Sequence, residues 1–286
     1  MTANIFDDRP CALGEGPLWH PEREQFFWFD ILGKRLLSRT DDGPLEWQFD
    51  EMFSAAGWVD RDTMILASQT ALWRFSIGTG ATEKIVALEA GNAATRSNDG
   101  RADPYGGFWI GTMGLNAEPG LGAIYRYYRG ELRKIFDDIT VSNAISFPPG
   151  RGTACFADTR TRQVMRVALD SDGWPSGTPD VFIDTQDEEL NPDGAVFDEQ
   201  GNFWVAQWGS ARVACYDAQG NFVRSVEVDA RHSSCPAFGG PDLGDLYVTS
   251  ARQGISKDVL EDEPSNGMTF RVAGVATGQK EHRVIL

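Results

Sequence analysis

The sequence has 286 residues, of which 41% are hydrophobic and 24% are charged, and this is the composition of an ordinary globular protein. A formal net charge of −16 argues against nucleic acid and anionic membranes as partners, because an acidic surface repels both. A small neutral molecule or a cation remains compatible with this charge.

Residues 1–14 hold charged side chains at positions 7 to 9 and have no apolar core, so they do not form a signal peptide. No apolar run reaches the length needed to span a membrane, and we expect a cytoplasmic protein that is a monomer. The cysteines show no C-x-x-C spacing and are expected to be reduced and buried; they are Cys11, Cys155, Cys215 and Cys235. No two of the three histidines have metal-site spacing, so any metal must be held by oxygen ligands.

Along the chain, six segments share one layout. Each has a polar or Gly-rich opening, a short apolar strand, a turn with Gly, Asp or Pro, an aromatic-rich strand and a third apolar strand. The segments begin near Gly14, Ser54, Asn98, Ser142, Pro192 and Ser234. Successive starts lie roughly 40 to 50 residues apart, which is the repeat length of four-stranded propeller blades. The sequence therefore predicts an all-β fold, a six-bladed β-propeller formed by residues 1–286 as one domain.

The strand and turn signals agree with this repeat. In Asn202–Gln207, Phe203 and Val205 alternate with Trp204 and Ala206, a pattern that predicts a half-buried strand. Helical periodicity is missing almost everywhere. Asp-x-x-Gly turns occur at 103–106, 198–201 and 217–220, where Gly supplies the positive φ that a hairpin needs.

The opening of each repeat is expected to face the central channel, where a buried carboxylate is costly unless it is paired or metal-bound. The polar residues of these openings are Glu15, Arg96, Asn98, Asp99, Asn143 and Asp193. A closed ring brings equivalent positions together, whatever their separation in sequence. Two carboxylates and an amide would then hold a hard cation such as Ca²⁺, Mg²⁺ or Mn²⁺. Taken one at a time, the Asp-Gly pairs and Glu15 are also compatible with ordinary turns and loops.

Several of these residues lie in motifs of one known family. The motifs are L-G-E-G-P-L-W (13–19), R-S-N-D-G-R-A-D (96–103), F-W-I-G-T-M (108–113), V-S-N (141–143), N-P-D-G (191–194), W-V-A-Q-W (204–208), and F-G-G-P-D-L with L-Y-V-T-S-A (238–251). Together they cover nearly the whole chain, which resembles the family of regucalcin (senescence marker protein 30) and bacterial gluconolactonases. The resemblance implies a six-bladed propeller whose metal is bound by Glu15, Asn143 and Asp193, with Arg96 and Asn98 holding a sugar.

The chain departs from the family pattern at Asn143-Ala144, where the family usually has Asn-Gly. The segment 114–122 resembles the family's lid and contains Asn116 and Glu118, whose roles the sequence leaves open. The implied activity is metal-dependent hydrolysis of an aldono-1,4- or 1,5-lactone to the aldonic acid by attack of water, with Asp193 as general base. Ca²⁺ is the first choice of ion, and Zn²⁺, Mn²⁺, Mg²⁺ or Fe²⁺ are alternatives. Two other functions stay open: a phosphotriester or aryl ester hydrolase of the same propeller type, and a non-catalytic calcium-binding propeller.

Overall fold

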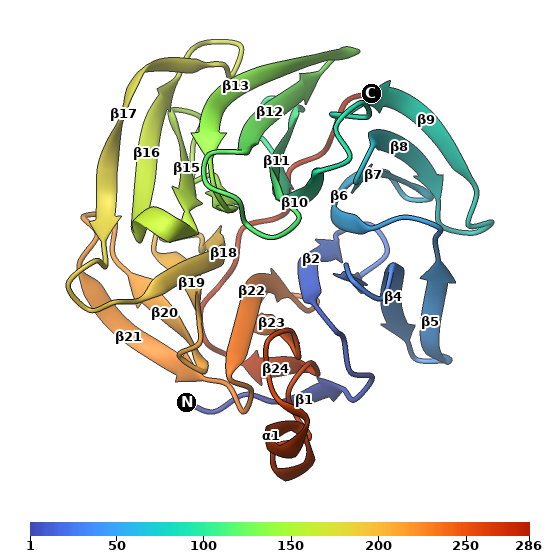
Figure 1. The fold of residues 1–286 in the computed structure, drawn as a ribbon, viewed down its shortest axis with the longest axis vertical. Coiled ribbons are helices and arrows are strands. Elements are labelled where there is room, and N and C mark those ends of the chain that lie inside the picture. Colours follow the sequence, from blue (N-terminus) through green and yellow to red (C-terminus); the bar gives the residue numbers. More distant parts are fainter.

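The structure is a computed structural model that describes all 286 residues. Six four-stranded antiparallel sheets stand around a common centre as the blades of a β-propeller, and the chain passes through them in sequence order (Figure 1). This arrangement confirms the predicted fold class. None of the helices has the length and apolar character needed to span a bilayer.

Each blade begins with its innermost strand. Blade 1 contains β2 (Gly14–His20), β3 (Gln25–Asp30), β4 (Arg35–Thr40) and β5 (Gly43–Gln48), and blade 2 contains β6 (Phe53–Asp60), β7 (Thr63–Ser68), β8 (Ala71–Ser76) and β9 (Thr82–Ala87). Blade 3 contains β10 (Thr95–Ala102), β11 (Phe108–Gly114), β12 (Gly122–Tyr128) and β13 (Glu131–Ile139), and blade 4 contains β14 (Ser142–Ser146), β15 (Thr153–Asp158), β16 (Gln163–Leu169) and β17 (Pro175–Asp184). Blade 5 contains β18 (Asn191–Phe197), β19 (Phe203–Trp208), β20 (Arg212–Tyr216) and β21 (Phe222–Glu227).

Blade 6 is built from both ends of the strand sequence. It contains β22 (His232–Gly239), β23 (Asp245–Ala251), β24 (Thr269–Ala273) and, as its outermost strand, β1 (Asn4–Asp7) from the N-terminus. The short helix α1 (Lys257–Asp262) lies between β23 and β24, and a 3-10 turn, η1 (Thr159–Thr161), follows β15. Pairing of β1 with β24 ties the N-terminal segment to the last blade, so that blade holds both ends of the strand order together.

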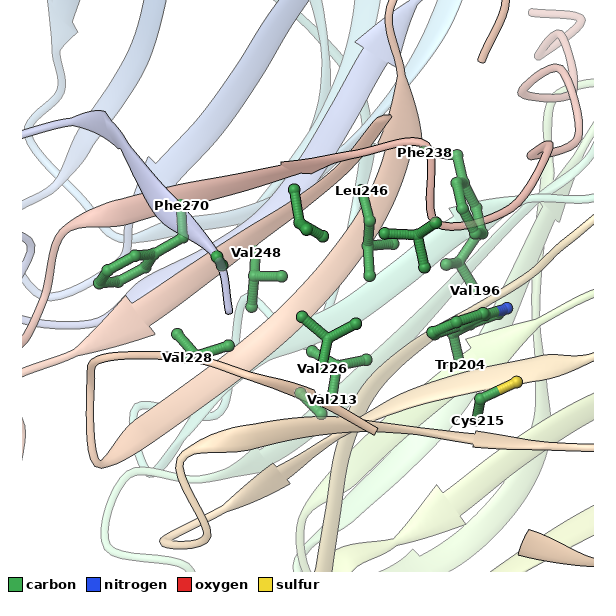
Figure 2. Close-up of a cluster of buried hydrophobic side chains, with 14 of the residues drawn as sticks. Val196, Trp204, Val213, Cys215, Val226, Val228, Phe238, Leu246, Val248 and Phe270 are labelled. Atoms are coloured by element: carbon green, nitrogen blue, oxygen red, sulfur yellow. The ribbon is translucent and has the colours of Figure 1, made fainter. Parts of the chain in front are cut away.

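The hydrophobic core is divided among the blade interfaces. Six buried clusters lie between successive blades around the ring. Figure 2 shows the one between blades 5 and 6, in which Trp204, Val213 and Val226 of blade 5 meet Phe238 and Leu246 of blade 6. A fully buried side chain of this size stabilises the fold by about 1.5–3 kcal/mol relative to leaving it exposed, so the blades hold one another together.

The expectation of a half-buried strand at Asn202–Gln207 is wrong. Phe203 and Val205 do point to one face, but that face packs on blade 4, while Trp204 and Ala206 on the other face pack on blade 6. Blade 5 lies between two neighbouring blades, so both faces of β19 are buried. The predicted Asp-x-x-Gly turns are present, with Gly106 at φ 92°, Gly201 at 85° and Gly220 at 84°. The four cysteines are free and buried, as predicted.

The C-terminal residues 275–286, which we call the strap, cross the face of the ring where the inner strands end. Their hydrogen-bond partners come from five blades: Leu243 of blade 6, Glu199 of blade 5, Phe147 of blade 4, Gly106 of blade 3 and Trp58 of blade 2. The end of the chain therefore lies across the ring from β24 (Figure 1). The side chains of Glu281 and Arg101, the latter near the end of β10, form an ion pair beneath the channel.

Candidate active site

The starts of the inner strands meet at the face of the ring opposite the strap, and each carries a local irregularity. The pairing of β2 with β3 shifts between Glu15 and Leu18, and that of β14 with β15 shifts between Asn143 and Ser146. Equivalent shifts in β10 and β18 enclose Asn98 and Asp193. β-Bulges of this kind bend a strand and redirect its side chains. The predicted site residues therefore lie at or next to the bulges, which turn them toward the channel.

The chain departs from the family pattern at Ala144, the residue that follows Asn143 at the bulge in β14. Ala144 adopts a left-handed conformation with φ 55°, and Gly16, which follows Glu15 in the same place on β2, has φ 53°. This region favours Gly because it crowds a Cβ atom against the following carbonyl oxygen. The fold therefore imposes the same turn on Ala144 that a glycine would make, and Asn143 keeps its place.

All five predicted site residues line one cavity of about 590 Å³ at this face. The volume falls within the range of small-molecule sites. The polar residues of the lining are Glu15, Arg96, Asn98, Asn116, Asn143, Thr159, Asp193, His232 and Gln253, and the apolar ones are Leu13, Met113, Leu115, Ala117, Val141 and Trp208. Residues from blades that are distant in sequence thus share one pocket, as the ring closure required.

A chain of hydrogen bonds runs along the cavity wall from blade 3 to blade 5. Arg96 Nη1 donates to Asn98 Oδ1 at 2.7 Å, and Asn98 Nδ2 donates to Asn143 Oδ1 at 3.1 Å. Asn143 Nδ2 donates to Thr159 Oγ1 at 2.8 Å, and the Thr159 hydroxyl donates to the Pro192 carbonyl oxygen at 2.8 Å. Because Asn143 Nδ2 donates to Thr159, Asn143 Oδ1 points away from Thr159. Asn143 Oδ1 accepts one hydrogen bond, from Asn98, and its second lone pair is left for a ligand.

The carboxylates of the channel strongly perturb one another. Burial, together with the charge of Asp99, raises the pKa of Glu15 to about 8. Burial and the charges of Glu15 and Asp99 raise the pKa of Asp193 well above its usual range. Asp99 lies deeper, where its Oδ2 accepts the Ile145 N–H at 2.7 Å, and burial raises its pKa to about 6. Burial also lowers the pKa of Arg96 to about 10.

This donor set fits a cation. Glu15 accepts a hydrogen bond from the Gly16 N–H at 3.3 Å, no side chain donates to Glu15 or Asp193, and Arg96 forms no ion pair with either. The charge of Arg96 acts on both carboxylates without a direct ion pair, so two buried carboxylates stay costly and a divalent ion would relieve that cost. No group of three His, Cys, Asp or Glu side chains is placed to hold a metal ion, so a metal here also needs the Asn143 amide oxygen.

Several cavity residues were not predicted from the sequence. Thr159 follows β15 in a 3-10 turn and carried no recognisable signal. Trp208 is the last residue of a family-like motif, and its indole stacks on the imidazole of His232 with ring centroids 4.2 Å apart and an interplanar angle of 15°. Burial lowers the pKa of His232. The stack joins the end of β19 to the start of β22, a contact between blades that sequence spacing does not reveal.

The structure separates the two polar residues of the 114–122 segment. Asn116 lines the cavity and Glu118 does not. Glu118 instead accepts hydrogen bonds from the backbone N–H of Asn116 at 3.0 Å and from its Nδ2 at 2.9 Å, which helps hold the turn around Ala117, at φ 56°. Glu118 is placed to position Asn116 rather than to contact a ligand in the cavity.

Comparison with known proteins is consistent with this geometry. The family model described as the SMP-30/Gluconolactonase/LRE-like region matches residues 13–252. An L-arabinolactonase of Azospirillum brasilense is 33% identical over 289 residues, covering 97% of this chain and 95% of that protein. A 6-deoxy-6-sulfogluconolactonase of Pseudomonas putida is 32% identical over 266 residues, covering 92% and 91%.

A solved structure extends the match to the fold. A calcium-binding protein, regucalcin, from Agrobacterium tumefaciens strain C58 superposes with a TM-score of 0.97 at 36% identity, over 100% of this chain and 98% of that one. The family match covers residues 13–252, and the identities and the superposition cover more than nine-tenths of the chain. The protein therefore belongs to the SMP-30/gluconolactonase/LRE-like family and is an enzyme of the lactonase class.

Proposed function

We propose that the protein hydrolyses a sugar lactone, an aldono-1,4- or 1,5-lactone, to the aldonic acid, and that Glu15, Asn143 and Asp193 hold a divalent cation for this reaction. The observation that carries the proposal is the meeting of two buried carboxylates and an oriented amide oxygen in one cavity, without a protein cation bonded to them. The lactonase names of the relatives support the substrate class.

The cation, when bound, would supply positive charge beside the lactone carbonyl oxygen, where negative charge develops during hydrolysis. Ca²⁺ suits the all-oxygen donor set, and the calcium-binding relative supports this choice. Zn²⁺, Mn²⁺, Mg²⁺ and Fe²⁺ also accept two carboxylates and an amide, so the choice among them is left to experiment.

Arg96 and Asn98 would orient the sugar. Arg96 uses its Nη1 atom for the Ser97 carbonyl and for Asn98, so its Nε and Nη2 atoms stay available to donate to sugar hydroxyls. The amide nitrogen of Asn98 is fully used, but its Oδ1 keeps a lone pair that accepts a hydroxyl proton. Fixing the lactone in one orientation lowers the entropic part of the barrier.

Asp193 would act as the general base. Asp193 is buried and accepts no hydrogen bond from a side chain, so its carboxylate is free to accept a proton in the cavity. Asp193 accepts a proton from water while the water oxygen bonds to the carbonyl carbon. The bond from the carbonyl carbon to the ring oxygen then breaks, and Asp193 returns its proton to the ring oxygen, which becomes a hydroxyl of the aldonic acid.

The test uses the Asp193→Ala variant, with Asp217→Asn, a partly exposed turn carboxylate of the same blade that lies outside the cavity, as control. Both proteins are stripped of metal and reloaded with each ion, then assayed on a panel of aldonolactones with a pH indicator. We expect Asp193→Ala to lose about 10²- to 10⁴-fold in kcat/KM and Asp217→Asn to match wild type. If Asp193→Ala without metal hydrolyses lactones as fast as wild type, the mechanism is wrong.

The same panel separates the other functions. An aryl ester and a phosphotriester are included, although the polar cavity floor favours a polyhydroxylated substrate. Strong thermal stabilisation by metal with no turnover of any lactone would instead favour a non-catalytic propeller.

A further inference from the structure

The stacked pair of Trp208 and His232 forms one wall of the cavity. Trp208 ends β19 and His232 begins β22, and both side chains are half-buried and line the cavity. Their rings are nearly parallel, so the two present a rigid aromatic edge rather than two independent side chains. Nothing in the hydrolytic scheme above uses this wall.

The position of the wall relative to the polar residues follows from the fold. Trp208 pairs with Asn191, which lies two residues before Asp193 on β18. Asn191 is the first residue of β18, and the inner strands begin at the cavity face, so the stack lies nearer the cavity mouth than Asp193 does. β22 lies three blades from β10 around the ring, so His232 faces Arg96 from the opposite side of the channel (Figure 1).

The two walls match the two kinds of surface on a sugar ring. Such a ring carries hydroxyls around its edge, and its faces expose C–H groups that pack against aromatic rings. Arg96 and Asn98 can bond to the hydroxyls, and the aromatic pair on the opposite wall can pack against a C–H face. We propose that Trp208, held by His232, packs against the C–H face of the lactone ring and selects lactones in which that face carries no axial hydroxyl. This inference rests on the proposed function.

A purely structural role for Trp208 needs its own control. Trp208 also packs against the buried cluster that contains Leu13 and Phe75. Trp47, on the outer strand β5, is likewise half-buried and packs against the same cluster, but it lies outside the cavity. Replacing Trp47 therefore perturbs the same core without touching the proposed substrate wall.

The experiment measures kcat and KM for Trp208→Leu, Trp208→Phe and Trp47→Leu on D-glucono-1,5-lactone, which has no axial hydroxyl, and D-mannono-1,5-lactone, which has one. We expect Trp208→Leu to raise KM for gluconolactone by about 3- to 10-fold with kcat changed less than twofold, which is the signature of lost ground-state binding. Trp208→Phe restores most of the affinity, Trp47→Leu leaves KM unchanged, and the preference for gluconolactone over mannonolactone shrinks in Trp208→Leu.

The possible results separate the two proposals. The proposed role of the aromatic wall is overturned if wild type hydrolyses lactones but Trp208→Leu leaves KM unchanged. It is also overturned if Trp47→Leu raises KM as much as Trp208→Leu does. Either result leaves the lactonase proposal intact. Equal loss of affinity for both lactones overturns the selection against axial hydroxyls. Wild type that turns over no lactone overturns the proposed function itself. Thermal melts of each variant establish that it is folded, and Trp208→Met, which also lacks an aromatic face, serves as the test if Trp208→Leu is not.

Discussion

The replacement Glu281→Gln removes the carboxylate that neutralises Arg101 beneath the channel while keeping the size of the side chain. The side chain of Arg101 is 11% exposed and that of Glu281 is 8% exposed, and the Arg101 Nε atom is buried with no hydrogen-bond partner. Breaking a buried pair from one side leaves an uncompensated charge, which costs about 3–5 kcal/mol. Since both side chains keep some contact with water, we take the lower figure, about 3 kcal/mol.

This cost converts into a shift of the melting temperature. Unfolding releases about 2.1 cal/mol/K of entropy per residue, or about 0.6 kcal/mol/K for 286 residues, so 3 kcal/mol corresponds to a fall of about 5 °C. The measurement is a calorimetric or circular dichroism melt. Glu131→Gln is the control, because Glu131 pairs with Arg133 at 2.9 Å while both side chains are more than half exposed, and such a pair contributes less than about 1 kcal/mol.

Catalysis is not expected to depend on this ion pair. Arg101 lies at the end of β10 away from the cavity, so Glu281→Gln is expected to leave kcat/KM for a lactone at the wild-type value. A double variant, Arg101→Met with Glu281→Met, is expected to recover most of the lost stability, because it removes both buried charges. If Glu281→Gln melts within 1 °C of Glu131→Gln, the strap does not depend on this pair and the argument fails.

Two further predictions concern the cavity. Thr159→Val removes the acceptor of the Asn143 amide N–H, so the apparent Ca²⁺ affinity should fall about 10- to 100-fold. Titration calorimetry measures this affinity, and Thr159→Ser should restore it. An unchanged affinity in Thr159→Val would contradict the role of Thr159. With metal chelated, the raised pKa values of Glu15 and Asp193 mean that the folded state keeps protons that the unfolded state has lost. The contribution of these two groups to stability is therefore full at low pH and is lost as pH rises through about 8. Between pH 7 and 8, above the pKa range of the histidines, melts should therefore show that stability falls by up to about 1.4 kcal/mol per pH unit for each retained proton. Both added Ca²⁺ and the Glu15→Gln replacement should weaken this trend. Stability that rises with pH in this window would refute the prediction.

The polar residues of the repeat openings could be predicted because a propeller uses one equivalent position per blade. Glu15, Asn143 and Asp193 each follow the same point of their repeat, and a closed ring converts equal positions into a common site. The bulges that direct these side chains were less visible. Gly16 follows Glu15 at one of them, whereas Ala144 adopts the same left-handed conformation although it is not a glycine.

What the sequence by itself determined is local and periodic: the blade repeat, the turns, the all-β class and the chemical types of the channel residues. Only the tertiary structure decided which blades meet. It placed β1 in the last blade, buried both faces of β19, drew the strap across five blades, and stacked Trp208 on His232 above the cavity floor. Each of these depends on contacts between segments far apart in the chain, whose strength comes from buried area and charge that no sequence spacing encodes.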